Sequence, residues 1–440
     1  MPRLQHFGYF FGRGFGPQAW GRPAYDWGYD WTRPQLYQQS IRELEQAGLD
    51  LLIMEDALSL GSEQTLDVRV RSAYGGPKHD PLLLAPYLFD VTQHIGIAPT
   101  INTGATPPYL AARQAATLQH LSNSRFGLNV VTDVGSARHF GAPPLPHDAA
   151  YDRADEWMRV VRQLWNSWGE GALVADTESG HFADASRIEV THHSGTYFDG
   201  VTGPLNALPF GDGDPVVVSP GGSPRGLAFA GANSQVQLAL AHLTVDSIRA
   251  YRQRVLEAAA AAGRSGADIK TLFVIKPEIV SSVEEAERVV AASTHPSDAE
   301  LDFILLGQSS DAETDLTGLD LDKPLDPSVF GEHVSQGTIA GLRGGFDSFA
   351  DVTLRELVIA KARKRRVGDG DGMVGTVDEI ADLFEALGDD AGNDGFIFSG
   401  DLHPTSIHRV LDELVPTLRR RGLLRREYGD GGLRGNLLDF

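Results

Sequence analysis

The sequence of 440 residues contains no cysteine. This absence excludes disulfide bonds, thiolate zinc sites and cysteine nucleophiles, and it fits a reducing cellular interior. Basic residues are scarce as well, since 38 Lys and Arg stand against 59 Asp and Glu and give a formal charge of −21. Proteins bind nucleic acids by neutralising phosphates with Lys and Arg, so we expect no nucleic-acid partner.

Long apolar runs are also missing. No stretch of the sequence approaches the roughly 18 to 20 apolar residues that a membrane-spanning helix needs. Gly and Pro interrupt residues 1–23 throughout, so this segment lacks the apolar core of a signal peptide. We therefore expect a soluble, cytoplasmic protein with no membrane partner.

Common nucleotide and zinc signatures are absent. The sequence has neither a P-loop GxxxxGK[ST] nor a zinc-binding HExxH. The run GRGFG at 12–16 has the wrong spacing for a dinucleotide fingerprint, and no helical pattern follows it. His192 and His193 are adjacent and would point apart on a strand. These observations disfavour a nucleotide-driven enzyme and a metal site.

The sequence does contain a regular alternation of short apolar runs and longer helical patterns, which is typical of βα units. Hydrophobic residues make up 42% of the chain, enough for a large core. The predicted strands are 6–11, 49–55, 95–100, 125–131, 215–220, 235–240, 269–275 and 395–399. Eight strands separated by helices favour an α/β fold with a closed (β/α)8 TIM barrel. We expect one barrel domain over residues 1–440, with insertions at about 57–80, 169–214 and 293–372.

Polar residues follow four of these strands, and the carboxyl ends of barrel strands share one mouth. A single residue of this kind is more often a helix cap or a turn former, but four such strand ends together favour a polar ligand. The residues are Asp56, Asn102, Thr103, Asn129, Asp133, Gly221, Gly222 and Ser223. The last three open a predicted helix, where glycine lets the backbone approach an anion.

The helix predicted from about residue 148 begins with a second feature. His147 and Tyr151 are four residues apart and share a helix face, in the first turns where the helix dipole favours an anion. Alternatively, Asp148 caps a helix that packs its aromatic residues inward. The sequence leaves both interpretations open.

Three long segments make the chain recognisable. They are RFGLNVVTDVGSARHFG at 125–141, PHDAAYDRADEWMRVVRQLWNSW at 146–168 and GTYFDGVTGPLN at 195–206. They closely resemble the nitrilotriacetate monooxygenase and dibenzothiophene-sulfone monooxygenase family, whose members are flavin-dependent and belong to the bacterial luciferase-like superfamily. The resemblance runs almost from end to end. It implies a (β/α)8 barrel with insertions that binds FMN at the barrel mouth.

The resemblance also implies which residues contact the flavin. Asp56 matches the contact at the end of strand two, and Thr103, with Asn102 beside it, matches the contact of strand three. Asn129 is the Asn of the NVVT motif, and His147 and Tyr151 are the His and Tyr of the HxxxY helix start. Ser223 matches the serine of the phosphate loop.

The chain departs from the family pattern at three positions. Asp133 and Gly222 each stand where the family usually has Ser, and His139 stands where it usually has Asn. Gly222 removes a phosphate hydroxyl and leaves backbone N–H groups. Asp133 places a carboxylate near the flavin or substrate, so we expect a neutral or cationic substrate, because an anionic polycarboxylate would be repelled. Alternatively, Asp133 caps a turn or pairs with Arg138.

The resemblance implies a two-component, FMN-dependent monooxygenase. A separate NAD(P)H-dependent flavin reductase would supply reduced FMN through a transient encounter. The enzyme would use O2 as co-substrate to oxygenate or cleave a small organic molecule, with a heterocycle as the leading class. We predict Asp133 and His147 as catalytic residues, and we expect a homo-oligomer.

Three alternatives are open. A deazaflavin-dependent oxidoreductase of the same superfamily would transfer hydride and would not use oxygen. A non-catalytic flavin-binding protein would bind FMN and form no product. A barrel glycosidase would use a carboxylate pair such as Asp133 and Glu278, and would turn over a glycoside without flavin or O2.

Overall fold

Eight parallel strands close into a barrel, in the order β1-β14-β11-β10-β9-β4-β3-β2. The computed structural model describes residues 2–12, 30–63, 65–71, 73–132, 135–210, 213–312, 314–330, 339, 342–400 and 407–440. The barrel strands are β1 (His6–Phe11), β2 (Leu51–Met54), β3 (Gly96–Asn102), β4 (Gly127–Val131), β9 (Val216–Pro220), β10 (Val236–Ala239), β11 (Lys270–Ile275) and β14 (Gly395–Gly400). The predicted (β/α)8 barrel is confirmed, and each predicted strand overlaps an observed one.

Strand β2 explains why the strands are continuously apolar. Leu51 and Ile53 belong to the cluster inside the barrel, whereas Leu52 and Met54 belong to the cluster between the barrel and the helices. All four side chains are fully or almost fully buried. Successive side chains of a strand point to opposite faces, so a strand that is covered on both faces needs apolar residues at every position.

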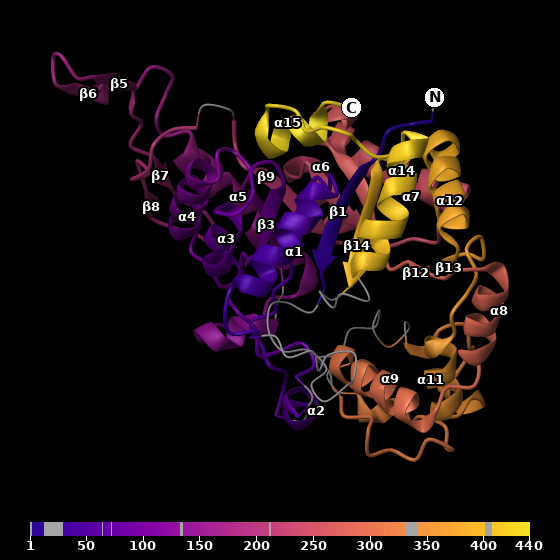
Figure 1. Ribbon diagram of the computed structural model, residues 1–440. Coiled ribbons are helices and arrows are strands. Elements are labelled where there is room, and N and C mark those ends of the chain that lie inside the picture. The colour runs from indigo at the N-terminus through magenta and orange to yellow at the C-terminus, as the bar shows by residue number, and fades with distance from the viewer. Residues whose placement is uncertain are drawn as a thin grey trace.

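Helices surround the barrel (Figure 1). Helix α1 (Gln35–Gln46) buries Tyr37, Ile41 and Leu44, whose spacing places them on one face. The other helices of the main body are α3 (Pro81–Phe89), α4 (Pro108–Leu121), α5 (His147–Trp165), α6 (Pro224–Asn233), α7 (Val245–Ala261), α12 (Val377–Ala391) and α14 (Val415–Arg421). A π-helical turn over Arg409–Leu414 precedes α14.

Helix α15 (Gly432–Leu438) closes the end of the barrel where the strands begin. Its Leu433 and Leu437 are fully buried in the cluster inside the barrel. Gly96, the first residue of β3, makes room for them, since a Cβ at this position would lie 2.2 Å from Leu433 Cδ1. Strands β1 and β14 run away from α15, so the barrel mouth lies at the opposite end (Figure 1).

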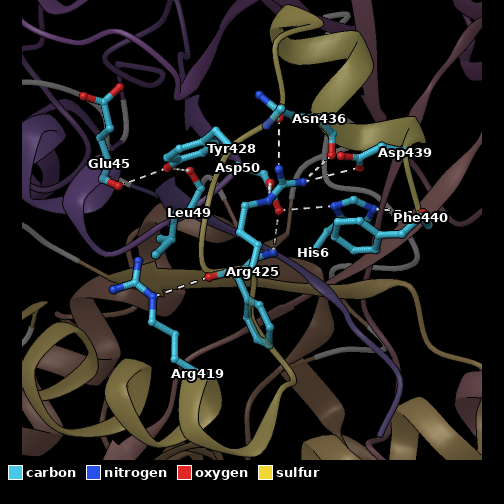
Figure 2. Close-up of polar contacts among 12 residues, drawn as sticks. His6, Glu45, Leu49, Asp50, Arg419, Arg425, Tyr428, Asn436, Asp439 and Phe440 are labelled. Carbon is cyan, nitrogen blue, oxygen red and sulfur yellow. Dashed lines mark hydrogen bonds and ion pairs between the residues drawn. The ribbon is translucent and has the colours of Figure 1, made fainter. Parts of the chain in front are cut away.

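A buried polar network holds this closed end together (Figure 2). Asp50 precedes β2, and its Oδ2 accepts a hydrogen bond from the Phe7 N–H at 3.1 Å and lies 3.2 Å from His6 Nδ1. Its Oδ1 forms an ion pair with Arg425 Nε at 2.7 Å. Arg425 also donates to Asn436 Oδ1 of α15 at 2.9 Å. The network therefore connects β1, β2 and the segment that carries α15.

Two of the predicted insertions contain helices that lie together beyond the mouth (Figure 1). These helices are α2 (Leu66–Val70), α9 (Asp298–Asp311) and α11 (Leu354–Ala362). Helices α9 and α11 share a hydrophobic cluster of their own, which includes Leu301 and Leu357. Helix α9 also packs on α2 through Leu306 and Val68. Helix α8 (Val283–Ala292) and the paired strands β12 (Glu278–Ile279) and β13 (Val374–Gly375) connect this region to the barrel.

The third insertion forms two small antiparallel pairs. They are β5 (Leu173–Asp176) with β6 (His181–Ala183), and β7 (His192–His193) with β8 (Val201–Thr202). The hairpin of β5 and β6 projects away from the main body (Figure 1). His193 is buried beside Glu156, with 3.1 Å between Nε2 and Oε1, whereas His192 is exposed. The two adjacent histidines therefore face different surroundings, as expected for neighbours on a strand.

No helix in the described part of the chain combines the length and hydropathy needed to cross a bilayer. The described residues also contain no group of three or more His, Asp or Glu side chains arranged to hold a metal ion.

Candidate active site

The mouth of the barrel brings together residues that follow β2, β3 and β4. Asp56 and Asn102 line a pocket of about 240 Å³, which we call the mouth pocket. Asn102 is buried at the end of β3, and its Oδ1 accepts a hydrogen bond from the Gly104 N–H at 2.8 Å. The lining also includes Val131 of β4 and Phe140. Two of the residues predicted from the sequence therefore share one cavity.

The Asp56 carboxyl has an unusual proton affinity. Its pKa is raised to about 6, chiefly by partial burial and also by the neighbouring carboxylates of Glu55 and Asp80, whereas the Lys78 ammonium opposes this effect. A carboxyl with a pKa near neutrality accepts a hydrogen bond when ionised and donates one when protonated. Asp56 can therefore bind either a hydrogen-bond donor or a hydrogen-bond acceptor of a ligand.

Two other predicted residues, Asn129 and Thr103, are buried. Asn129 Nδ2 donates to Thr100 Oγ1 at 2.7 Å, and Thr100 Oγ1 donates to the Met54 carbonyl at 2.8 Å. Asn129 Oδ1 and Thr103 Oγ1 are buried and find no hydrogen-bond partner among the described residues. The lining of the mouth pocket includes Thr100 but neither Asn129 nor Thr103. Buried polar atoms without partners are costly, and they fit a site that receives a polar ligand.

The loop after β9 and the start of α5 form a second part of the site. Gly221 has a φ of +121°, and a Cβ there would lie 2.6 Å from Tyr151 Oη. Ser223 caps α6, with its Oγ accepting from the Gly226 N–H at 3.0 Å, and it lies 3.4 Å from His147 Nε2. We call residues 221–223 the glycine loop. The structure thus brings His147 and Tyr151 against the loop whose sequence predicts phosphate binding.

Tyr151 is a buried hydroxyl donor in this arrangement. Burial raises the pKa of its phenol, and a hydrogen bond with Thr132 opposes that effect in part. The Arg225 guanidinium lies 5.6 Å from the centre of the Tyr151 ring, but it is paired with Asp152 at 2.8 Å and with Asp155 at 2.6 Å. The attraction of the glycine loop for an anion therefore comes from backbone N–H groups at the start of α6.

The other predicted positions have different surroundings. Asp133 lies outside the described residues. The His147 side chain is 60% exposed, pairs with Asp148 at 2.6 Å and stands at the glycine loop, outside the lining of the mouth pocket. Glu278 forms an ion pair with Lys364 at 2.7 Å. Asp148 does not cap α5, because the helix start has no side-chain cap and Asp148 lies within its first turn. The rings of His147 and Tyr151 are in contact, with 5.2 Å between their centres.

Several residues that shape the site were not predicted from the sequence. Thr100 and Phe140 line the mouth pocket, and Gln237 Nε2 donates to the Gly221 carbonyl at 3.0 Å. Thr100 lies inside an apolar strand. Gln237 of β10 faces the surrounding helices, because its neighbours Val236 and Leu238 belong to the cluster inside the barrel. The sequence signal of both was a polar residue within a buried strand. Phe140 gave a weaker signal, since aromatic residues are common in short helical turns.

Comparison with known proteins places these features in a family. The model of the luciferase-like monooxygenase family matches residues 26–394. The chain belongs to this family. As a luciferase-like monooxygenase, it is an oxygenating enzyme with the barrel fold of the family.

The luciferase-like monooxygenase has well-matched relatives. It is 33% identical to dibenzothiophene-sulfone monooxygenase of Rhodococcus erythropolis strain XP, over 99% of this chain and 96% of that protein. It is 31% identical to nitrilotriacetate monooxygenase component A of Aminobacter aminovorans, over 93% of this chain and 92% of that protein. Among solved structures, riboflavin lyase with modified FMN and riboflavin matches with a TM-score of 0.81 and 26% identity, over 100% of this chain and 96% of that one.

Proposed function

We propose that this monooxygenase binds reduced FMN supplied by a separate NAD(P)H-dependent flavin reductase and uses O2 to oxygenate or cleave a small organic molecule, with a heterocycle as the leading class. The glycine loop carries the proposal. Gly221 has no side chain at the point where Tyr151 Oη approaches the backbone, and Ser223 and His147 stand beside it. This arrangement suits the phosphate that distinguishes FMN from riboflavin.

The mouth pocket suits the ring end of the same cofactor. Asp56 and Asn102 offer polar groups at its wall, and the unpartnered oxygens of Asn129 and Thr103 belong to β4 and to the residue that follows β3. Bound reduced FMN would supply the electrons that activate O2. The chain's own residues would hold the phosphate, orient the ring and shield the reacting centre from water.

The protein's own groups have separate tasks in this proposal. Because burial keeps the Tyr151 phenol protonated, it donates a hydrogen bond to a phosphate oxygen. Asp56 accepts a hydrogen bond from an N–H of the ring edge when it is ionised. The reductase encounter requires no nucleotide site on this chain, in agreement with the absence of a dinucleotide fingerprint from its sequence.

Two measurements test the cofactor and the reaction. Fluorescence titration should give tighter binding of FMN than of riboflavin or of a deazaflavin. Turnover with a flavin reductase, NADH and ¹⁸O2 over a panel of heterocycles and polycarboxylates should give a product with incorporated ¹⁸O by mass spectrometry. Preference for a deazaflavin would favour hydride transfer, and FMN binding without any product would favour a binding protein.

We further propose that Asp133 accepts a hydrogen bond from the substrate or acts as a base on it. Asp133→Asn removes the charge and keeps the shape, so coupled turnover should fall at least tenfold, about 1.4 kcal/mol, with FMN affinity nearly unchanged. Asp133→Ser introduces the residue common in the family and should not restore activity. A serine variant as active as the parent would remove Asp133 from the mechanism.

A further inference from the structure

A second and larger hollow lies at the mouth, on the side of β10 and β11. Its volume is about 990 Å³, and it is lined by the loops that follow these strands and by residues 342–345, 357, 360–365 and 371–374. We call it the basic hollow, because its lining includes six Lys and Arg side chains and two acidic ones. The whole chain has the opposite balance, with 38 basic and 59 acidic residues. Positive charge is therefore concentrated here against the general trend.

Part of this charge is already neutralised. Lys364 Nζ lies 2.7 Å from Glu278, and Arg365 Nη1 lies 3.0 Å from Asp371. These two pairs use both acidic residues of the lining. The four other cations make no ion pair with any described residue, and they are Lys276, Arg343, Lys361 and Arg363. They come from the β11 loop and from two parts of the long insertion, so they approach the hollow from different directions.

Another part of the lining is apolar. Leu240 follows β10 and is 78% exposed, although it lies at the barrel mouth and not on the outer surface of a helix. Val274 and Ile275 at the end of β11 line the same hollow. An exposed leucine beside other apolar groups in a concave site indicates an apolar ligand surface. The hollow therefore combines an apolar wall with unpaired cations.

We propose that the basic hollow binds an organic anion that has an apolar body and a carboxylate group, and that this molecule is the substrate. The body packs on Leu240, and the carboxylate lies among Lys276, Arg343 and Lys361. The volume is in the range of small-molecule sites. The proposal rests on the proposed function, because it concerns the substrate of that reaction. It differs from the expectation of a neutral or cationic substrate, which depends on Asp133.

The flavin phosphate is a separate anion in this arrangement. The glycine loop follows β9 and offers backbone N–H groups, whereas the basic hollow follows β10 and β11 and offers long cationic side chains. Backbone N–H groups suit a phosphate, and the side chains of Lys and Arg suit a carboxylate. Two anionic groups can therefore be held at one mouth without competing for the same donors.

The test uses flavin-free full-length protein and two probes of the same shape, 2-naphthoate and neutral 2-naphthamide. Isothermal titration calorimetry at low salt should give at least tenfold tighter binding of the carboxylate. Raising the salt concentration should narrow this difference, because screening weakens charge attraction. Equal affinity for the two probes would overturn the proposal.

Variants locate the effect in the basic hollow. The triple change Lys276→Gln, Arg343→Gln and Lys361→Gln should abolish the preference for naphthoate and leave naphthamide binding within twofold. A matched triple change of exposed arginines on α1, α4 and α8, Arg42→Gln, Arg113→Gln and Arg288→Gln, removes the same net charge and should preserve the preference. Equal effects of the two triple changes would reject the site.

A further variant tests the apolar wall. Leu240→Ser should weaken the binding of both probes by a similar factor, since each loses the same apolar contact. Loss of naphthoate binding alone would contradict the assigned position of the body. Because none of these measurements uses FMN or O2, failure of this proposal can be told apart from failure of the proposed monooxygenase reaction.

Discussion

At the scale of single residues, the Tyr151 hydroxyl connects α5 with the glycine loop. We expect Tyr151→Phe and Ser223→Ala each to weaken FMN binding, because each removes a hydrogen bond to a charged phosphate. The loss should be about 1.5 to 3 kcal/mol, or roughly tenfold to a hundredfold in affinity. Fluorescence titration measures it, and riboflavin, which has no phosphate, should bind both variants as it binds the parent.

Tyr109→Phe provides the control for a generic loss of a tyrosine hydroxyl. Tyr109 lies on α4, and its hydroxyl accepts a hydrogen bond from the Asn206 N–H at 3.2 Å, away from the glycine loop. This variant should bind FMN like the parent. If Tyr151→Phe and Ser223→Ala also bind FMN like the parent, the phosphate lies elsewhere.

Asp56 gives a prediction about pH. Burial raises its pKa from 3.8 to about 6, so the folded protein binds this proton more tightly than the unfolded chain. The resulting stabilisation is complete below about pH 4 and is lost as the pH rises through 6. Asp56→Asn should therefore be more stable than the flavin-free parent at about pH 7.5, by about 1 kcal/mol once partial exposure is considered.

Thermal unfolding at several pH values measures this effect. The difference between Asp56→Asn and the parent should grow between about pH 4 and pH 7, and should be small at the acidic end. Asp302→Asn changes an exposed carboxyl of α9 and serves as the control. A constant difference between Asp56→Asn and the parent across this range would mean that the Asp56 carboxyl does not titrate as proposed.

At the scale of elements, β3 and α15 pack so closely at Gly96 that no side chain fits between them. Gly96→Ala places a methyl group against Leu433, and we expect it to cost about 1 to 3 kcal/mol through overpacking. Leu433→Ala removes a fully buried side chain and should cost about 2 to 5 kcal/mol. In the double variant the clash disappears, so its cost should be less than the sum of the two, as measured by urea unfolding.

Gly435→Ala is the matched control on the same helix. A Cβ at Gly435 meets no atom within 4 Å, so alanine should be neutral or slightly stabilising there. Strict additivity of Gly96→Ala and Leu433→Ala would contradict the packing of α15 inside the barrel.

The barrel elements could be predicted from the sequence, but α15 and the helices of the long insertion could not. Strands such as β2 are covered on both faces, which produces a continuous apolar run that the sequence displays directly. Leu433 and Leu437, in contrast, are two apolar residues in a Gly-rich segment, and their burial depends on the space left by Gly96. The insertion was predicted only as an excursion from the barrel, because α9 and α11 bury their apolar residues against each other and not against the barrel.

Only part of the candidate site could be predicted from the sequence. The positions of Asp56 and Asn102 follow from strand order, because the carboxyl ends of parallel strands meet at one end of a barrel. The basic hollow does not follow from strand order. The run KARKRR at 361–366 is typical of a solvated helix face, and only the fold brings Lys361 and Arg363 to the same hollow as Lys276.

At the scale of the whole molecule, Asp50 joins parts of the chain that are far apart in sequence. Asp50→Asn would leave Arg425, with a side chain 4% exposed, without its closest carboxylate. Removal of one partner of a buried ion pair typically costs about 3 to 5 kcal/mol. Urea unfolding at neutral pH should detect this loss.

Asp439→Asn removes a more distant partner of the same arginine and serves as the control. Asp439 lies 3.6 Å from Arg425 and is 43% exposed, so its loss should cost less than about 1 kcal/mol. If the two variants are equally stable, the ion pair with Asp50 makes no special contribution to the closed end of the barrel.

The strand order also determines when the barrel can close during synthesis. β1 pairs with β2 on one side and with β14 on the other, and β14 begins at residue 395. At about 5 to 20 residues per second, a ribosome needs roughly 20 to 80 s to make the chain between them. Throughout that interval one edge of β1 has no strand to pair with, and the interior of the unclosed barrel is open to water. The nascent protein must therefore be protected from aggregation until its last strand emerges.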